Sequence, residues 1–179
     1  MTHPTHSLSG RPREGEYAAY QKVDIDLVPG NSAVAALETA AQQTLELLGN
    51  LDEGKIDYSY APGKWTIRQI LGHLIDDERI FVYRALCVAR GEQQPLPGFD
   101  EKDYVFQAGF EDRPWAELLA EYLSVREATL TFFQGISDEA WLRRGTVTDY
   151  TASVRGLAFH IAAHELHHLR VLQERYLSG

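Results

Sequence analysis

The sequence predicts an all-α protein that folds as a four-helix bundle with long connections. In four separate stretches, apolar side chains recur at intervals of three and four residues, the spacing that gives a helix one buried face. Residues that cap or stop helices punctuate the chain between these stretches. Four amphipathic helices with one or two long connections are typical of a bundle.

The four helices are expected at residues 32–48, 66–90, 114–135 and 153–176. Thr66 is a suitable N-cap for the second helix, with Gln69 three residues later as its capping-box partner. Pro114 suits the first turn of the third helix, because its missing N–H would be unpaired there in any case. Ser153 is expected to cap the last helix.

The connections carry less regular sequence. Residues 16–28 hold apolar side chains that could lie over the domain, and residues 50–65 form an irregular connector. Residues 91–113 form a long loop with a short helical turn expected near residues 101–106, and loops of this length are often functional lids. A small extended segment is expected at residues 145–151.

The composition limits the possible functions. The 179 residues suffice for one domain, with residues 1–15 expected as a mobile lead-in and residues 16–179 as the domain. The formal net charge of -9 argues against a nucleic-acid partner, since phosphate binding needs a basic face. No window holds the roughly 18 apolar residues of a membrane span. The single cysteine, Cys87, excludes an internal disulfide and fits a reducing cytoplasm.

Four of the seven histidines lie close together in the last predicted helix. Each residue advances about 100° around a helix, which places His164 and His168 with the apolar side chains of that helix. The same arithmetic turns His160 and His167 toward solvent, at the rim. In the second predicted helix, His73 lies at the edge of the apolar face.

Two imidazoles from one helix and one from a neighbour would form a metal site of His73, His164 and His168. Neutral imidazoles buried side by side lack an obvious partner, and a cation resolves this by accepting their lone pairs. Three nitrogen ligands leave coordination positions open, as in catalytic or sensing sites. Imidazole suits zinc, nickel, copper and iron, so the divalent ion stays unidentified.

Three acidic residues are candidates for roles beside the metal. Asp77 points into the apolar face one turn after His73, where it could support a ligand or act as a weak fourth ligand. Glu78 and Glu165 could hold the tautomers of the imidazoles. Glu165 also stands where the H-E-x-x-H motif of zinc proteases has its base, but such proteases need a sheet edge for the peptide, and no such sheet is expected.

Two segments resemble signatures of the DinB-like superfamily. Residues 61–79, from Ala-Pro-Gly-Lys-Trp-Thr through the segment that contains His73, resemble its second-helix signature, and residues 163–168, Ala-His-Glu-Leu-His-His, resemble its last-helix motif. The resemblance covers about residues 30–178 and implies a bundle, often dimeric, that binds nickel or zinc through the three histidines named above. In the thiol-dependent branch a Glu replaces one ligand, where this chain has His164, so the chain resembles the all-histidine group.

The expected function is that of a metal-dependent enzyme, with Ni, Zn or Fe as the ion. It would act on a small-molecule substrate by hydrolysis or by transfer of a low-molecular-weight thiol. The alternatives are a non-catalytic, stress-related protein that binds a metal or small molecule, and a bundle whose histidines only fill its core. The protein is expected to be a cytoplasmic homodimer, with neither nucleic acid nor membrane as a partner.

Overall fold

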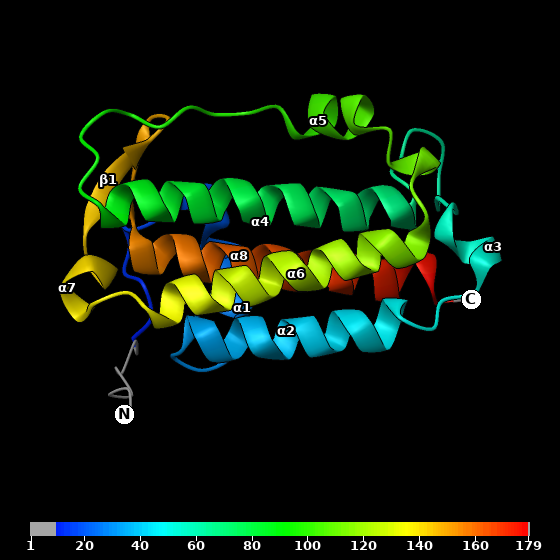
Figure 1. The fold of residues 1–179 in the computed structure, drawn as a ribbon, viewed down its shortest axis with the longest axis horizontal. Helices are drawn as coiled ribbons and strands as arrows, with labels where there is room; N and C mark the ends of the chain where they lie inside the picture. Colours follow the sequence, from blue (N-terminus) through cyan, green and yellow to red (C-terminus); the bar gives the residue numbers. More distant parts are fainter. Residues whose placement is uncertain (1–9, 179) are drawn as a thin grey trace.

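The computed structural model describes residues 10–178, and its long helices form the predicted four-helix bundle (Figure 1). The core helices are α2 (Ala33–Leu48), α4 (Ile67–Ala89), α6 (Trp115–Gln134) and α8 (Val154–Val171). Thr66 and Gln69 form the predicted capping box, and the Ser153 side chain accepts a hydrogen bond from the Gly156 N–H. Pro114 is the N-cap of α6 and so lies one position before the predicted first turn.

Shorter elements occupy the connections. They are η1 (Ala19–Gln21), α1 (Lys22–Leu27), α3 (Glu53–Ile56), α5 (Glu101–Ala108), η2 (Phe110–Asp112), α7 (Asp138–Trp141), β1 (Arg144–Val147), β2 (Tyr150–Ser153) and the π-helix η3 (Leu172–Tyr176). The helical turn and the extended segment expected from the sequence are α5 and the antiparallel pair β1–β2. The segment expected to lie over the domain contains α1, which packs against α8.

The path of the chain explains the long connection before α6. Around the bundle the helices follow the order α2, α8, α4, α6, so that α4 and α6 are neighbours. Figure 1 shows that α4 and α6 run in the same direction, opposite to α2 and α8. Two parallel neighbours cannot be joined by a short turn, because the chain must first return along the length of the bundle. Residues 90–114 make this return alongside α4 and include α5 and η2.

The core consists of two apolar clusters at opposite ends of the bundle. On α4, the first cluster begins at Phe81 and the second ends at Ile75. On α8, the buried residues of the first cluster end at Ala163, and those of the second begin only at Leu172, the first residue of η3. The interval on α8 contains His164 and His168 and the interval on α4 contains Asp77, whereas His73 lies beside the second cluster, between Leu71 and Leu74.

Part of the predicted lead-in is attached to the domain. Arg11 donates hydrogen bonds to the backbone oxygens of Val28 and Gly30, and Gly10 N–H donates to Asn31 O. Residues 1–9 lie outside the described residues, so the boundary at residue 15 stays a prediction. Within residues 10–178, no helix combines the length and the apolar character that a bilayer span requires.

Candidate metal centre

The three predicted ligands come together between α4 and α8, which pack against each other along the bundle. His164 Nε2 lies 3.0 Å from His73 Nε2 and 3.1 Å from His168 Nε2. One nitrogen from each of the three rings lies within 4.8 Å of the others. The single histidine on α4 thus faces a pair of histidines one turn apart on α8, the helix that runs beside it in the opposite direction.

The arrangement of donors fits a divalent cation. Asp77 Oδ2 lies 3.1 Å from His164 Nδ1, so the proton of the neutral ring belongs on Nδ1 and the lone pair of Nε2 faces the other two rings. Nitrogens bound tetrahedrally to zinc at its usual bond length are about 3.3 Å apart, close to the 3.0 and 3.1 Å that separate His164 Nε2 from the other two Nε2 atoms. Within residues 10–178, the three Nε2 atoms have no hydrogen-bond partners except one another.

Burial keeps two of the rings neutral, the form in which imidazole binds metal. Burial, with repulsion from His164, lowers the pKa of His73 to about 4. Burial and the neighbouring rings also hold the pKa of His168 well below its ordinary value. For His164, burial opposes the charged form, but the carboxylate of Asp77 outweighs it and raises the pKa. His164 is therefore the ring whose protonation competes most directly with a cation.

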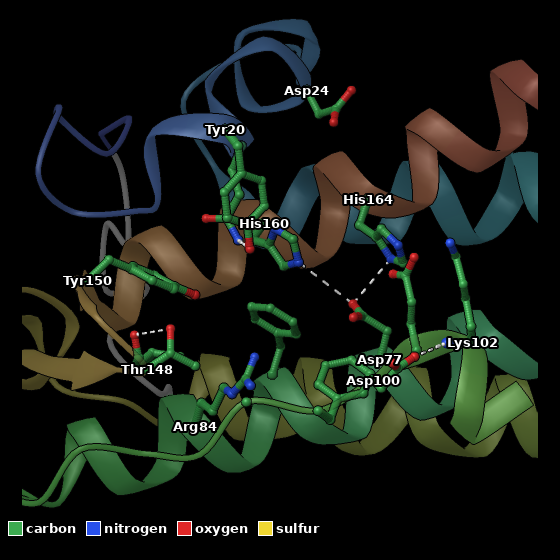
Figure 2. A pocket seen from close by; sticks show the side chains of 16 residues that line it. Tyr20, Asp24, Asp77, Arg84, Asp100, Lys102, Thr148, Tyr150, His160 and His164 are labelled. Carbon is green, nitrogen blue, oxygen red and sulfur yellow. Dashed lines mark hydrogen bonds and ion pairs between the residues drawn. The ribbon is translucent and has the colours of Figure 1, made fainter.

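Asp77 lies between two rings of α8, as Figure 2 shows. Its Oδ2 is also 3.7 Å from His160 Nε2, an atom that has no hydrogen-bond partner within residues 10–178. Burial opposes ionisation of Asp77, but the charges of His164 and His160 outweigh it and hold the pKa of the carboxyl well below its usual range. Asp77 is thus an anion placed behind the candidate ligand His164, on the side of the ring away from the other two histidines.

The two histidines expected at the rim differ in their surroundings. The helical wheel turned His160 toward solvent, whereas its side chain is only 11% exposed and its ring centroid lies 3.9 Å from that of Phe81. The wheel of one helix cannot show this, because α4 and α1 cover the face of α8 that carries His160. His167 is 38% exposed, and its Nδ1 lies 3.1 Å from Asp24 Oδ1.

The expectation that Glu78 and Glu165 hold the imidazoles needs correction, because both belong to a buried ion-pair cluster. Arg126 donates to both oxygens of Glu78, at 2.9 and 2.8 Å, and to Glu165 Oε2 at 2.5 Å. Thr44 Oγ1, at 2.6 Å, and the Tyr122 hydroxyl donate to Glu165 Oε1. All four carboxylate oxygens are engaged, so Glu165 is not free to act as the base of a zinc protease.

Two cavities adjoin the histidine cluster. One of about 790 Å³, here called the Arg84 cavity, is lined among others by Arg84, Tyr20, Tyr150, His160 and His164. The other, of about 670 Å³, is lined among others by Trp65, Tyr60, Phe106 and His168. Glu101 and Lys102 at the start of α5 line both cavities. The connection expected to be a lid therefore contributes a wall to each cavity.

Arg84 and Arg126 were not identified from the sequence, although a signal for each was present. Arg84 follows His73 by eleven residues, three turns along the helical face that also carries Asp77. Arg126 lies four residues after Tyr122 and seven before Phe133, within the apolar face of its helix. A buried arginine on such a face needs partners, and these become visible only when the helices are packed.

Comparisons with known proteins agree with this fold. A protein of Oceanobacillus iheyensis named "Putative metal-dependent hydrolase OB0413" is 26% identical over 94 residues. That match covers 52% of this chain and 53% of the relative, so the chain spans about half the length of the curated relative that it matches.

Two solved structures share the architecture. YfiT from Bacillus subtilis, described as a probable metal-dependent hydrolase with an unusual four-helix bundle topology, matches with a TM-score of 0.73 at 18% identity, over 96% of this chain and 97% of YfiT. The mycothiol-dependent maleylpyruvate isomerase matches with a TM-score of 0.65 at 13% identity, over 77% of this chain and 58% of that chain. At such identities, the likeness shows the fold alone.

The family itself is shown by sequence. The profile of the DinB superfamily matches residues 36–172, which extend from α2 to the start of η3 and include all three clustered histidines. This chain belongs to the DinB superfamily.

Proposed function

We propose that the protein is a divalent-metal-dependent enzyme whose metal is held by His73, His164 and His168, and that it acts on a small molecule by hydrolysis or by transfer of a low-molecular-weight thiol. The observation that supports this most is the convergence of three ring nitrogens within 4.8 Å beside two cavities. Three nitrogen donors leave coordination positions open. A bound divalent ion would supply Lewis-acid activation of a water or thiol at neutral pH.

The residues around the cluster have separate tasks in this proposal. Neutral His73 and His168 offer lone pairs, while Asp77 fixes the orientation of the His164 ring and balances positive charge. Glu101 and Lys102 of α5 would contact a substrate in either cavity from the side of the crossover connection. The ion pairs of Arg126 with Glu78 and Glu165 hold α4 and α8 in register one residue beyond Asp77 and His164.

Two reaction types fit this geometry. The relatives described as metal-dependent hydrolases favour hydrolysis, which needs one organic substrate and water. Thiol transfer needs two organic molecules, and the presence of two cavities beside one cluster, together with the fold shared with a mycothiol-dependent enzyme, favours it. A non-catalytic binding protein would use the same site without turnover.

The first experiment is elemental analysis of freshly purified protein. We expect about one divalent ion per chain in the parent, as a single three-nitrogen site requires. The His164→Ala variant should lose it, whereas His167→Ala, a control on the same helix, should keep it. If His164→Ala and the parent hold equal amounts of metal, the ligand assignment is wrong.

The second experiment distinguishes an enzyme from a binding protein. Nickel- and zinc-loaded protein is screened against simple esters and thiol adducts, with the His164→Ala variant as the blank. Turnover that depends on His164 supports the enzyme, and its class of substrate separates hydrolysis from thiol transfer. Tight retention of a small molecule without turnover supports the binding protein. The predicted homodimer is tested by the molar mass in solution from light scattering.

A further inference from the structure

Arg84 is a buried cation that has no acidic partner in the part of the chain that the structure describes. Only 4% of the residue is exposed, and its guanidinium makes one hydrogen bond, from Nη2 to Pro97 O at 2.8 Å. It forms no ion pair with a carboxylate within residues 10–178. Arginine is rarely buried unless it is paired, and Arg126 in the same bundle contacts two carboxylates. The guanidinium of Arg84 therefore has unused capacity to bind an anion.

The guanidinium is held in place by aromatic rings. It lies 4.6 Å from the ring centroid of Phe81 on α4 and 5.5 Å from that of Phe99 on the crossover connection. The hydrogen bond to Pro97 O attaches it to the same connection. An arginine fixed in this way loses little conformational entropy when it binds a ligand, so the arrangement favours binding.

Arg84 lines the Arg84 cavity, which is also lined by His164 of the histidine cluster. In Figure 2, Arg84, Tyr20, Thr148 and Tyr150 gather at one end of this cavity, and Asp77 and His164 lie toward the other. Arg84 follows Asp77 by seven residues on α4, a separation of about 10 Å along the helix axis. A small molecule could thus contact Arg84 with one end and reach the cluster with the other.

Tyr150 adds a hydrogen-bond donor beside Arg84. Burial raises the pKa of Tyr150 to about 12, so its hydroxyl stays protonated at neutral pH. The neighbouring Thr148 has a backbone φ of 52°, which is unusual for a β-branched residue. Such strained positions cluster at ligand sites. This one lies in the hairpin turn that brings Tyr150 to the cavity.

The other charges in the cavity limit the ligand to a single negative charge. Its lining contains four acidic residues, Asp24, Asp77, Asp100 and Glu101, but only two basic ones, Arg84 and Lys102. Three of these acids already have partners: Asp24 contacts His167, Asp77 contacts His164, and Asp100 accepts from the backbone N–H groups of Lys102 and Asp103. The acidic surroundings would repel a dianion, whereas one carboxylate matches one guanidinium.

We propose that the substrate carries a single carboxylate, which Arg84 binds at the end of the cavity away from the histidine cluster, with Tyr150 as a second donor. This inference rests on the proposed function, because the cluster is taken as the reacting centre. It adds the chemical class of the substrate: a small monocarboxylate whose charged end binds Arg84 while its reacting group extends along the cavity to the histidine cluster.

The test compares a carboxylate with its neutral and dianionic analogues. Calorimetric titrations measure the affinity of the parent for 4-phenylbutyrate, 4-phenylbutyramide and 2-phenylethyl phosphate, on zinc-loaded protein and on protein stripped with a chelator. We expect the carboxylate to bind at least about tenfold more tightly than the amide, as a charged hydrogen bond provides, and also more tightly than the phosphate. Because Arg84 and not zinc binds the carboxylate, this preference should persist after zinc is removed.

Variants test whether Arg84 causes the preference for the carboxylate over the amide. Arg84→Met should bind the acid and the amide alike, Arg84→Lys should keep part of the preference, and Tyr150→Phe should weaken acid binding several-fold. Arg170→Met removes an exposed positive charge that lines neither cavity and should leave the preference unchanged. Thermal melts check that each variant is folded. If Arg84→Met does not fold, the affinities of Arg84→Lys and Tyr150→Phe for the acid and the amide test the proposal.

Three results would overturn the proposal: equal affinities of the parent for acid and amide, a preference that survives in folded Arg84→Met, or a preference that vanishes with zinc. The last would show that the carboxylate binds the metal. Failure of the proposed function gives a different result. Protein that holds no metal would contradict the proposed function, but it could still show an Arg84-dependent preference for the carboxylate.

Discussion

Asp77 Oδ2 lies 3.1 Å from Nδ1 of His164, on the side of the ring opposite the nitrogen that faces His73 and His168. A carboxylate in this position fixes the tautomer and orientation of a ligating imidazole and raises its basicity. The contact joins α4 to α8, so the proposed metal site depends on the packing of two helices as much as on its candidate ligands.

Asp77→Asn should lower metal affinity by about 10- to 100-fold, because the loss of a carboxylate behind a ligating histidine has effects of this size. A competition titration with a chromogenic chelator measures the change. Asp76→Asn is the matched control: its side chain is 30% exposed and lies near Arg79 instead of a histidine. Equal affinities of the two variants would show that Asp77 does not support the site.

Acid should destabilise the metal-free protein partly through His73. In the unfolded chain this histidine takes up a proton near the ordinary histidine pKa of 6.5, whereas in the folded protein it does so only near pH 4, where burial has placed its pKa. Between these values the unfolded state binds more protons, so stability falls as the pH falls. His73 alone should lower the free energy of unfolding by about 3 kcal/mol over this range.

Urea unfolding in the presence of a chelator, from pH 7 to pH 4, measures this loss. His73→Gln should have a flatter pH dependence than the parent. His164 contributes with the opposite sign because its pKa is raised, so the comparison between variant and parent isolates the effect of His73. Identical pH dependences would contradict the prediction.

Arg126→Met should be strongly destabilising. It would leave Glu78 and Glu165 buried without their cation, and the loss of one partner from a buried ion pair costs about 3–5 kcal/mol. Denaturant unfolding monitored by circular dichroism gives the value. Lys22→Met, which removes an exposed partner of Asp26, should leave the unfolding midpoint unchanged. A midpoint for Arg126→Met close to that of the parent would show that the cluster contributes little to stability.

Gly72→Ala should disturb the end of the crossover connection. A Cβ at this position would lie 2.5 Å from ring atoms of Phe110 in η2. Such overpacking costs about 1–3 kcal/mol, partly offset by about 1 kcal/mol of helix propensity gained over glycine. We expect a lower melting temperature and faster proteolysis within residues 91–113. Gly54→Ala, where the nearest atom is at 3.5 Å, is the control, and equal proteolysis of both variants would refute the clash.

The four core helices and the histidine cluster could be predicted because they depend on local periodicity. Thr66 and Ser153 mark helix starts through their own side chains, and the three histidines occupy the faces that the apolar residues define. The direction of the 91–113 connection could not be predicted in this way. It follows from the parallel arrangement of α4 and α6, which is a property of their packing.

The sequence by itself determined the apolar face of each long helix, and so it placed His164 and His168 with the inward side chains of the last helix and His73 at the edge of the inward face of the second. Only the tertiary structure decided which inward polar groups meet. It pairs Glu78 and Glu165 with Arg126, buries His160 against Phe81, and leaves Arg84 without an acid among the described residues 10–178. The physical reason is that helical periodicity fixes a direction around one axis, whereas hydrogen bonds and ion pairs depend on distances between axes, which packing alone sets.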